Sequence, residues 1–172
     1  MKNTTIKTLS IGLLGLVSIS AFAQKTEKYY TDPVKLPSAI NTGAHEESYP
    51  LLSADGKSLY FVRTYTKAEG EHPAGEQNIL VSNWENGNWS LASDELPNLN
   101  NDHTNAVVGV SKDGQRLYVL NQYFKNVNKT AKGISFSKKE GNSWAMPTTV
   151  NVPPVEFVGE HYGANISRDE RV

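Results

Sequence analysis

The sequence predicts an all-β fold that is built from repeated small antiparallel sheets. A Ser-x-Asp-Gly-x-x-Leu-Tyr stretch that begins at Ser53 recurs at Ser111, 58 positions later. A third copy begins at Ser167, a further 56 positions on, and reads Ser-Arg-Asp-Glu. No stretch after residue 24 has the sustained 3.6-residue pattern of apolar residues that is typical of a helix. Units that repeat in order indicate a fold assembled from copies of one supersecondary element.

Each copy of the repeat has the features of a β-hairpin. Asp55-Gly56 and Asp113-Gly114 stand between apolar stretches. Glycine accepts a positive φ, and the aspartate side chain can accept hydrogen bonds from nearby backbone amides. The preceding serine can brace the same turn with its hydroxyl group. The residues that we expect to act as structural turn residues are Ser53, Asp55, Gly56, Ser111, Asp113, Gly114, Ser167 and Asp169.

The stretches around these turns predict four short strands per unit, because they are rich in β-branched and aromatic residues. In the first unit the expected strands are 49–52, 59–62, 79–81 and a short one near Trp89. In the second unit they are 106–110, 117–120, 134–136 and a short one near Trp144.

Two further landmarks precede each turn. Leu36-Pro37, Leu96-Pro97 and Val152-Pro153 lie 17, 15 and 15 positions before the three serines, and an aromatic residue lies seven or eight positions earlier still. Four short strands in about 55 residues describe one blade of a β-propeller. We therefore predict a partial β-propeller with two four-stranded antiparallel blades, about 29–88 and 89–143, and a third blade begun at 144–172. An ordinary β-sandwich with two similar hairpins is the alternative.

The repeat resembles the WD40-like propeller repeat of the TolB type. The Leu-Pro and aromatic elements resemble the version found in exported proteins of the bacterial envelope, often ahead of an OmpA-like domain. The resemblance covers residues 29–172, although the second copy lacks a counterpart of Pro50 and the third has Glu170 in place of glycine. Propellers close with about four to eight blades. We therefore expect an N-terminal fragment of a longer protein, or else blades supplied by other chains.

The first 23 residues have the pattern of a secretory signal peptide. Lys2 and Lys7 precede an apolar run at 9–21, and Ala21-Phe22-Ala23 before Gln24 has the small-x-small form of a cleavage site. The run is short for a bilayer span; an N-terminal core helix is the alternative. We expect an exported protein that lies in the periplasm or is associated with the outer membrane, with a mature part of 24–172. After cleavage it would not be an integral membrane protein.

Composition excludes several kinds of site and partner. The chain has no cysteine, which excludes disulfides and thiolate metal sites. Its formal net charge is −1, and removal of two lysines with residues 1–23 makes it −3. A charge this small argues against nucleic acid as the main partner. The lysines at 125–139, beside Tyr123 and Phe124, form a mildly basic stretch that we interpret as a solvated loop, with a nucleic-acid or glycan face as the alternative.

Three histidines invite a metal-site interpretation. His45, His103 and His161 each precede a first strand and have carboxylates nearby. Equivalent positions on successive blades are spread around a ring, so we interpret them as parts of a polar loop rim. His72 lies in the Gly- and Glu-rich loop 67–77 and has no partner at ligand spacing. We expect no metal and no cofactor.

No catalytic motif is present, and we expect no catalytic residue. Asp55 and Asp113 are accounted for by their turns rather than by a hydrolase pair or a sialidase Asp box, and Trp84, Trp89 and Trp144 by packing. The expected function is a non-enzymatic binding or scaffold module of the cell envelope. Its partner would be an envelope protein or a cell-wall component, bound through loops such as 64–77 and 121–132. The alternatives are the propeller domain of an exported peptidase or glycosidase whose catalytic part is missing, and a fragment without activity of its own.

Overall fold

The computed structural model describes residues 32–101, 104–124, 130–151 and 162–170. Nearly all of these residues belong to one compact part of the chain, Val34–Val172. The expected signal segment 1–23 lies outside the described residues. The described residues form strands and turns but no helix, which confirms the predicted all-β class. They accordingly include no helix that could cross a membrane.

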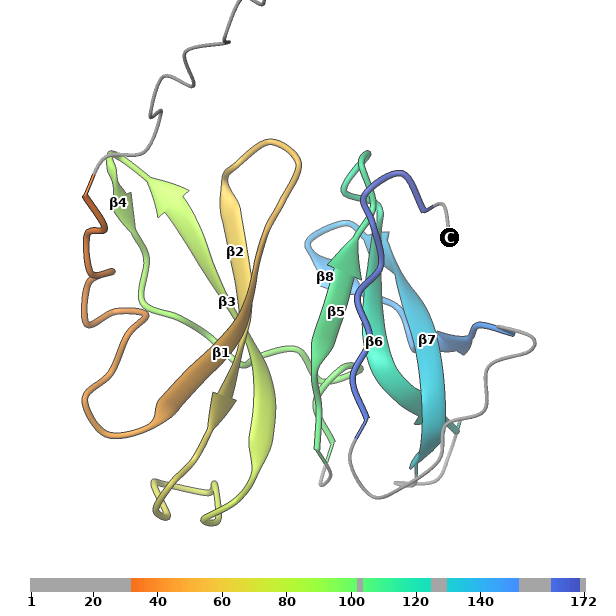
Figure 1. The fold of residues 1–172 in the computed structure, drawn as a ribbon, viewed down its shortest axis with the longest axis horizontal. Coiled ribbons are helices and arrows are strands. Elements are labelled where there is room, and N and C mark those ends of the chain that lie inside the picture. The colour runs from red at the N-terminus through yellow and green to blue at the C-terminus, as the bar shows by residue number, and fades with distance from the viewer. Residues whose placement is uncertain (1–31, 102–103, 125–129, 152–161, 171–172) are drawn as a thin grey trace, which may run out of the picture. The chain divides into compact units, whose positions relative to one another are not determined.

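The first sheet is a four-stranded antiparallel meander, in which each strand pairs with the next one along the chain (Figure 1). Its strands are β1 (Glu46–Leu52), β2 (Ser58–Thr64), β3 (Gln77–Glu85) and β4 (Asn88–Trp89). Alternate residues of β2 point to opposite faces of the sheet. Because β2 is apolar on both faces, the first sheet buries side chains on both sides.

The second sheet repeats this meander and adds a fifth strand. Its strands are β5 (Val107–Val110), β6 (Arg116–Tyr123), β7 (Thr130–Glu140), β8 (Ser143–Trp144) and β9 (Thr148–Thr149). Both β8 and β9 pair with β7, so together they form a broken outer strand.

The two sheets have the same strand register. Leu51 pairs with Tyr60 in the first sheet, and Gly109 pairs with Tyr118 in the second, each beside an irregularity in the first strand. These pairs are offset by the 58 positions that separate the two Ser-x-Asp-Gly copies. The outer strand repeats too, since Val81 bridges to Ser93 as Phe136 pairs with Thr148, 55 positions later. The sequence repeat is therefore a repeat of backbone pairing.

A buried serine fixes the outer strand in both sheets. The hydroxyl group of Ser82 donates to the carbonyl oxygen of Ser90 at 2.7 Å, and that of Ser137 donates to the carbonyl oxygen of Ala145 at 2.5 Å. Both serines are fully buried. Each therefore satisfies a backbone acceptor where the outer strand has left the regular ladder.

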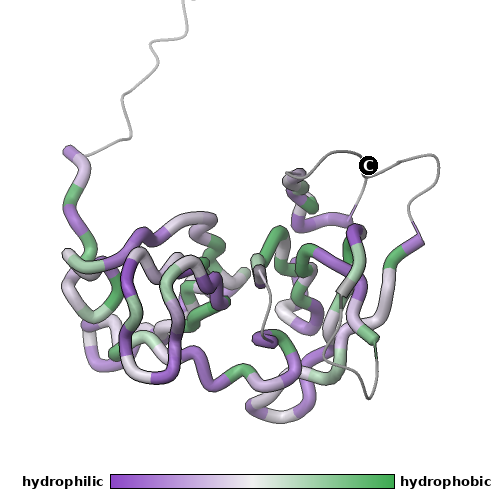
Figure 2. Tube along the Cα trace, turned by 90° about the horizontal axis from the view of Figure 1, so that it is seen from below, coloured by the Kyte–Doolittle hydropathy of each residue, from purple (hydrophilic) through white to green (hydrophobic). Residues whose placement is uncertain are grey.

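The main hydrophobic core lies between the two sheets. Tyr60 and Ile79 from the first sheet meet Leu117 and Val119 from the second, and Leu99 from the connection between them completes the cluster. Hydrophobic stretches of the two sheets face each other in Figure 2. A second cluster lies between the second sheet and residues 162–166, and a third covers the opposite face of the first sheet.

Several strands are longer than the sequence predicted. β7 has eleven residues, whereas the sequence indicated only three, and β2 continues through Arg63 and Thr64. The polar ends of these strands are held by side-chain hydrogen bonds that a hydrophobic pattern does not show. β9 was not predicted. The short strand expected near Trp89 is present as β4, and the first sheet also bridges to Ser93.

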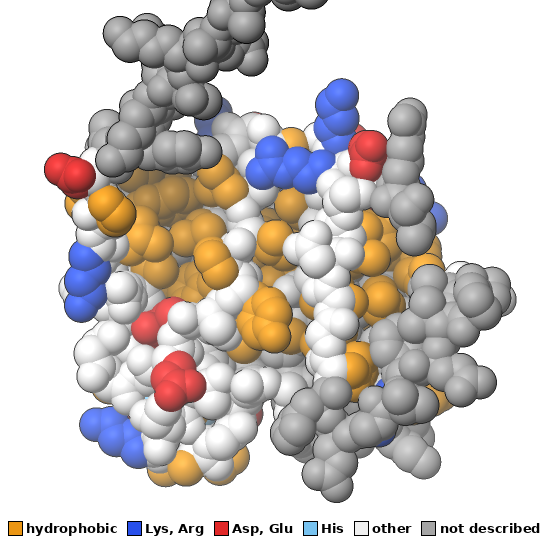
Figure 3. All heavy atoms as spheres, viewed as in Figure 1, with side chains coloured by type: hydrophobic (Ala, Val, Ile, Leu, Met, Phe, Trp, Pro, Cys, Tyr) orange, Lys and Arg blue, Asp and Glu red, His pale blue; other side chains and the backbone are white. Residues whose placement is uncertain are grey.

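The Leu-Pro landmarks have unequal surroundings in the two units. Leu96 is 8% exposed because both sheets cover it, whereas Leu36 is 39% exposed. Leu91 and Trp84, also in the first unit, are likewise largely exposed. Apolar side chains are visible over both sheets in Figure 3. Leu36 thus presents apolar surface at a position whose counterpart, Leu96, is packed in the main core.

Candidate functional site

The predicted turn residues form the same hydrogen-bond network in both sheets. In the first turn the Ser53 hydroxyl group donates to Asp55 Oδ1 at 2.6 Å, and the same oxygen accepts from the Lys57 backbone amide at 3.0 Å. Ser53 Oγ also accepts from the Ser58 backbone amide at 2.9 Å. Gly56 has a φ of 72°, in the left-handed region that favours glycine.

The second and third turns follow the same plan. The Ser111 hydroxyl group donates to Asp113 Oδ1 at 2.5 Å, and Gly114 has a φ of 68°. The Ser167 hydroxyl group donates to Asp169 Oδ1 at 2.8 Å. Glu170 replaces the glycine and still has a φ of 56°, so the third turn keeps the conformation without the residue that favours it.

These carboxylates serve the turns. Hydrogen bonds from the serine hydroxyl group and the following backbone amide hold the pKa of both Asp55 and Asp113 below the usual value. Both stay ionised and acceptor-only at neutral pH. The turns lie at one end of the sheets, which we call the turn end (Figure 1).

The opposite end of the first sheet, which we call the loop end, carries a structured loop between β2 and β3, residues 65–76. The Tyr65 backbone amide donates to the Glu76 carbonyl oxygen at 2.9 Å, which closes the base of the loop. Within it, Glu69 and His72 exchange two backbone hydrogen bonds of 3.0 Å and form a miniature hairpin around Gly70. This loop is therefore built by specific contacts, which the sequence did not predict.

Contacts between aromatic rings stabilise the loop. The rings of Tyr65 and His72 are stacked, with centroids 4.2 Å apart and planes 13° from parallel. The ring of His45, from the segment that enters β1, lies 4.9 Å from Tyr65 on a tilted plane. Tyr65 is buried, and burial raises the pKa of its phenol. Two segments that are distant in sequence, loop 65–76 and the segment that enters β1, thus meet around Tyr65.

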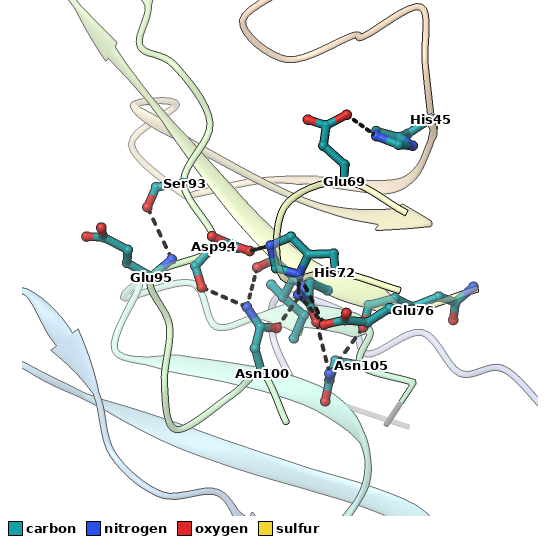
Figure 4. Close-up of polar contacts among 12 residues, drawn as sticks. His45, Glu69, His72, Glu76, Ser93, Asp94, Glu95, Asn100 and Asn105 are labelled. Atoms are coloured by element: carbon teal, nitrogen blue, oxygen red, sulfur yellow. Dashed lines mark hydrogen bonds and ion pairs between the residues drawn. The ribbon is translucent and has the colours of Figure 1, made fainter. Parts of the chain in front are cut away.

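His72 connects the loop to the segment that links the two sheets. Its Nε2 lies 3.1 Å from Asp94 Oδ2, and its Nδ1 lies 3.3 Å from Glu76 Oε1 (Figure 4). The buried Asn78 donates to Glu76 Oε1 at 2.9 Å. The sequence showed no partner for His72 at metal-ligand spacing and did not predict these hydrogen-bonding contacts, because Asp94 is distant in sequence and the Glu76 contact needs the folded loop.

His45, which the sequence led us to interpret as part of a polar loop rim, is buried. Its side chain is 1% exposed, and its Nε2 donates to Glu69 Oε2 at 2.8 Å. The Glu69 side chain is 61% exposed, and the hydrogen bond from His45 lowers its pKa. His45 is buried because Tyr65 offers an aromatic face beside it, a contact that sequence spacing does not show.

The connection between the sheets reaches the loop end through two asparagines. Asn100 Oδ1 accepts a hydrogen bond from the Ile79 backbone amide at 2.8 Å, and Asn100 Nδ2 donates one to the Ile79 carbonyl oxygen at 2.9 Å. Asn105 is fully buried and donates to the Gln77 carbonyl oxygen at 3.1 Å. Tyr123 donates to the Leu99 carbonyl oxygen at 2.8 Å, and burial raises the pKa of its phenol. The loop end is thus held by buried polar contacts.

Other residues singled out in the sequence are distributed as follows. His103, His161, Lys125 and Lys129 lie outside the described residues. Trp144 is buried, whereas Trp84 is 46% exposed and lies edge-to-face with Trp89. Among the described residues, no three His, Asp or Glu side chains are grouped as a metal site would require. The arrangement at the loop end can present charge and hydrogen-bonding groups to a partner.

Comparison of the chain with known protein families, with curated proteins and with solved structures finds no match.

Proposed function

We propose that the chain is a partial β-propeller of the WD40-like, TolB-type repeat class. Two sheets with the same register, the same serine-braced turn and the same buried serine on the third strand support this proposal. A third copy of the turn begins beside the second sheet, in chain order. Repetition of both the units and their packing is what a propeller requires.

We propose that this module is exported and acts as a non-enzymatic binding or scaffold module of the cell envelope. Its partner would be an envelope protein or a cell-wall component, docked at the loop end. The carrying observation is loop 65–76, which the Tyr65–His72 stack and the contact of His72 with Asp94 hold in one conformation. A loop that is ordered before binding loses less conformational entropy when a partner docks.

Two exposed glutamates of this loop, Glu69 and Glu71, outnumber its one exposed lysine, Lys67. Glu69 is largely exposed, and Glu71 lies at the tip of the miniature hairpin. A partner docking here would place cationic or hydrogen-bond-donating groups against them. In peptidoglycan, free amines of peptide stems are groups of this kind.

Co-sedimentation with purified peptidoglycan and with envelope membranes tests the proposal. We expect the chain to sediment with one of them, and the Glu69→Gln, Glu71→Gln double variant to weaken sedimentation. The matched control is Glu85→Gln with Glu140→Gln, which removes two exposed carboxylates at the turn end. No sedimentation of the wild type, or equal loss in both double variants, would refute docking at the loop end.

An activity measurement separates this proposal from the hydrolase alternative. The purified chain should not turn over peptide or aryl-glycoside substrates. Turnover that disappears when one acidic residue is changed would end the binding-module interpretation.

A further inference from the structure

The segment Tyr162–Ile166 lies along β5 and leads into the third turn, Ser167–Glu170 (Figure 1). The Ile166 backbone amide donates to the Val108 carbonyl oxygen at 2.9 Å, and the Lys112 amide donates to the Arg168 carbonyl oxygen at 3.0 Å. The order of these two bonds is that of a parallel pair. The segment therefore adds to the second sheet through backbone contacts that any sequence could make, and specificity must come from side chains.

The first specific contact is steric. A Cβ atom on Gly109 would lie 2.7 Å from Ile166 Cβ and 3.0 Å from the Ile166 carbonyl oxygen. The first distance is shorter than real Cβ contacts allow and the second is unusually tight, so a side chain here would displace the segment. The equivalent residue of the first sheet is Leu51, which would fill the space.

The second contact is electrostatic. Glu170 Oε1 accepts from Arg116 Nε at 2.8 Å and from the Tyr118 hydroxyl group at 2.6 Å, and Oε2 accepts from the second arginine nitrogen. A two-point contact between arginine and carboxylate is directional as well as strong. The first sheet has Ser58 and Tyr60 at the equivalent positions. Ser58 donates to Asn83, and Tyr60 is buried between the sheets.

A third contact fixes the other end of the segment. The Tyr162 hydroxyl group donates to Asn121 Oδ1 at 2.5 Å and accepts from the Gly133 backbone amide at 3.1 Å. Asn121 has a φ of 75° at the irregularity between β6 and β7. The segment is therefore held at both ends and at its middle.

We propose that this face of the second sheet is a docking site that selects a segment with one residue packed against Gly109, which we call the notch, and a carboxylate in the turn four residues later. In this chain the occupant is the segment 162–170, with Ile166 at the Gly109 notch and Glu170 on Arg116. The equivalent positions of the first sheet have neither the notch nor the cation, and the segment contacts that sheet through Arg168, which donates to the Leu52 carbonyl oxygen at 2.9 Å. This selectivity fixes which sheet the third unit joins, and it goes beyond the proposed binding function.

Hydrogen exchange of the full chain, read at single amides by NMR, tests the proposal. Glu170→Gln removes a charged partner, so exchange at the Ile166 and Lys112 amides should rise about tenfold or more. Gly109→Val should raise exchange at the same amides because the added side chain would clash with Ile166. The amides of β2 and β3 should be unaffected in both variants, which shows that the chain still folds. Glu140→Gln is the matched control and should change nothing.

A charge exchange provides the decisive comparison. Arg116→Glu or Glu170→Arg alone should release the segment, and the two changes together should restore most of the protection at Ile166. Restoration supports a charge-selective site. Failure to restore it, or full protection of the segment in Glu170→Gln, would overturn the proposal.

Discussion

Replacing the glycine of either repeated turn by alanine should destabilise the protein by the same amount. Gly56 and Gly114 have φ values of 72° and 68°, where an alanine costs about 1–2 kcal/mol. An added Cβ would meet only Leu52 Cδ2, at 4.0 Å, in the first turn and nothing within 4 Å in the second. The cost is therefore conformational and free of steric clash. Part of it is offset because alanine restricts the unfolded chain, which leaves about 1 kcal/mol per turn.

Urea unfolding followed by tryptophan fluorescence measures this cost. Each single variant should lower the unfolding free energy by about 1 kcal/mol and the melting temperature by about 3 °C. The double variant should lose about 2 kcal/mol, because neither glycine has the other turn within contact distance. Gly43→Ala is the control: Gly43 has no positive φ and open space around it, so alanine should change stability little. Unequal costs at the two turns would refute their structural equivalence.

Three further predictions follow from the repeated contacts. Ser82→Ala and Ser137→Ala each remove the donor of a part-buried hydrogen bond to a backbone carbonyl oxygen, and each should cost about 1 kcal/mol in the same urea assay. The lowered pKa values of Asp55 and Asp113 mean that their stabilisation is present above the ordinary value of 3.8 and is lost as pH falls through the folded values. The melting temperature should therefore fall below that pH, and less steeply in the Asp55→Asn, Asp113→Asn double variant. Burial and the hydrogen bond to Glu170 raise the pKa of Tyr118 to about 12. The stabilisation that Tyr118 contributes is therefore present below its ordinary pKa of 10.0 and is lost as pH rises towards 12. NMR titration of the Tyr118 ring should show the raised pKa, and Glu170→Gln should reduce the shift.

The sequence was informative wherever the structure is determined locally. The Asp-Gly turns could be predicted because every contact of Asp55 and Asp113 lies within a few residues along the chain. The strands beside them could be predicted because their apolar residues are contiguous. The lengths of β2 and β7 could not, because their ends are polar and depend on partners in other strands.

The loop end could not be predicted because its contacts are long-range. His45 is buried against Tyr65, 20 positions away, and His72 reaches Asp94 across 22 positions. Spacing arguments test whether residues can share one turn or one strand face. They do not identify pairs that meet only after the sheets have formed.

The two units therefore resemble each other more closely at the turn end than at the loop end. At the turn end, the same residue types recur with the same hydrogen bonds. At the loop end, Glu47 and Arg63 of the first unit form an ion pair of 3.0 Å, and both side chains are 12% exposed. The equivalent positions of the second unit, 58 residues later, are Asn105 and Asn121.

The role of these positions is nevertheless the same in both units. Arg63 donates to the Ile40 carbonyl oxygen at 3.1 Å, and Asn121 donates to the Thr104 carbonyl oxygen at 2.8 Å. Each fastens the segment that enters its own sheet. An ion pair in the first unit and two asparagines in the second thus do the same thing: each supplies a donor to a backbone carbonyl oxygen near buried strands. The side-chain types at the loop end can therefore differ between units while the backbone contacts stay the same. Successive units could in this way present different surfaces at the end where we propose that partners dock.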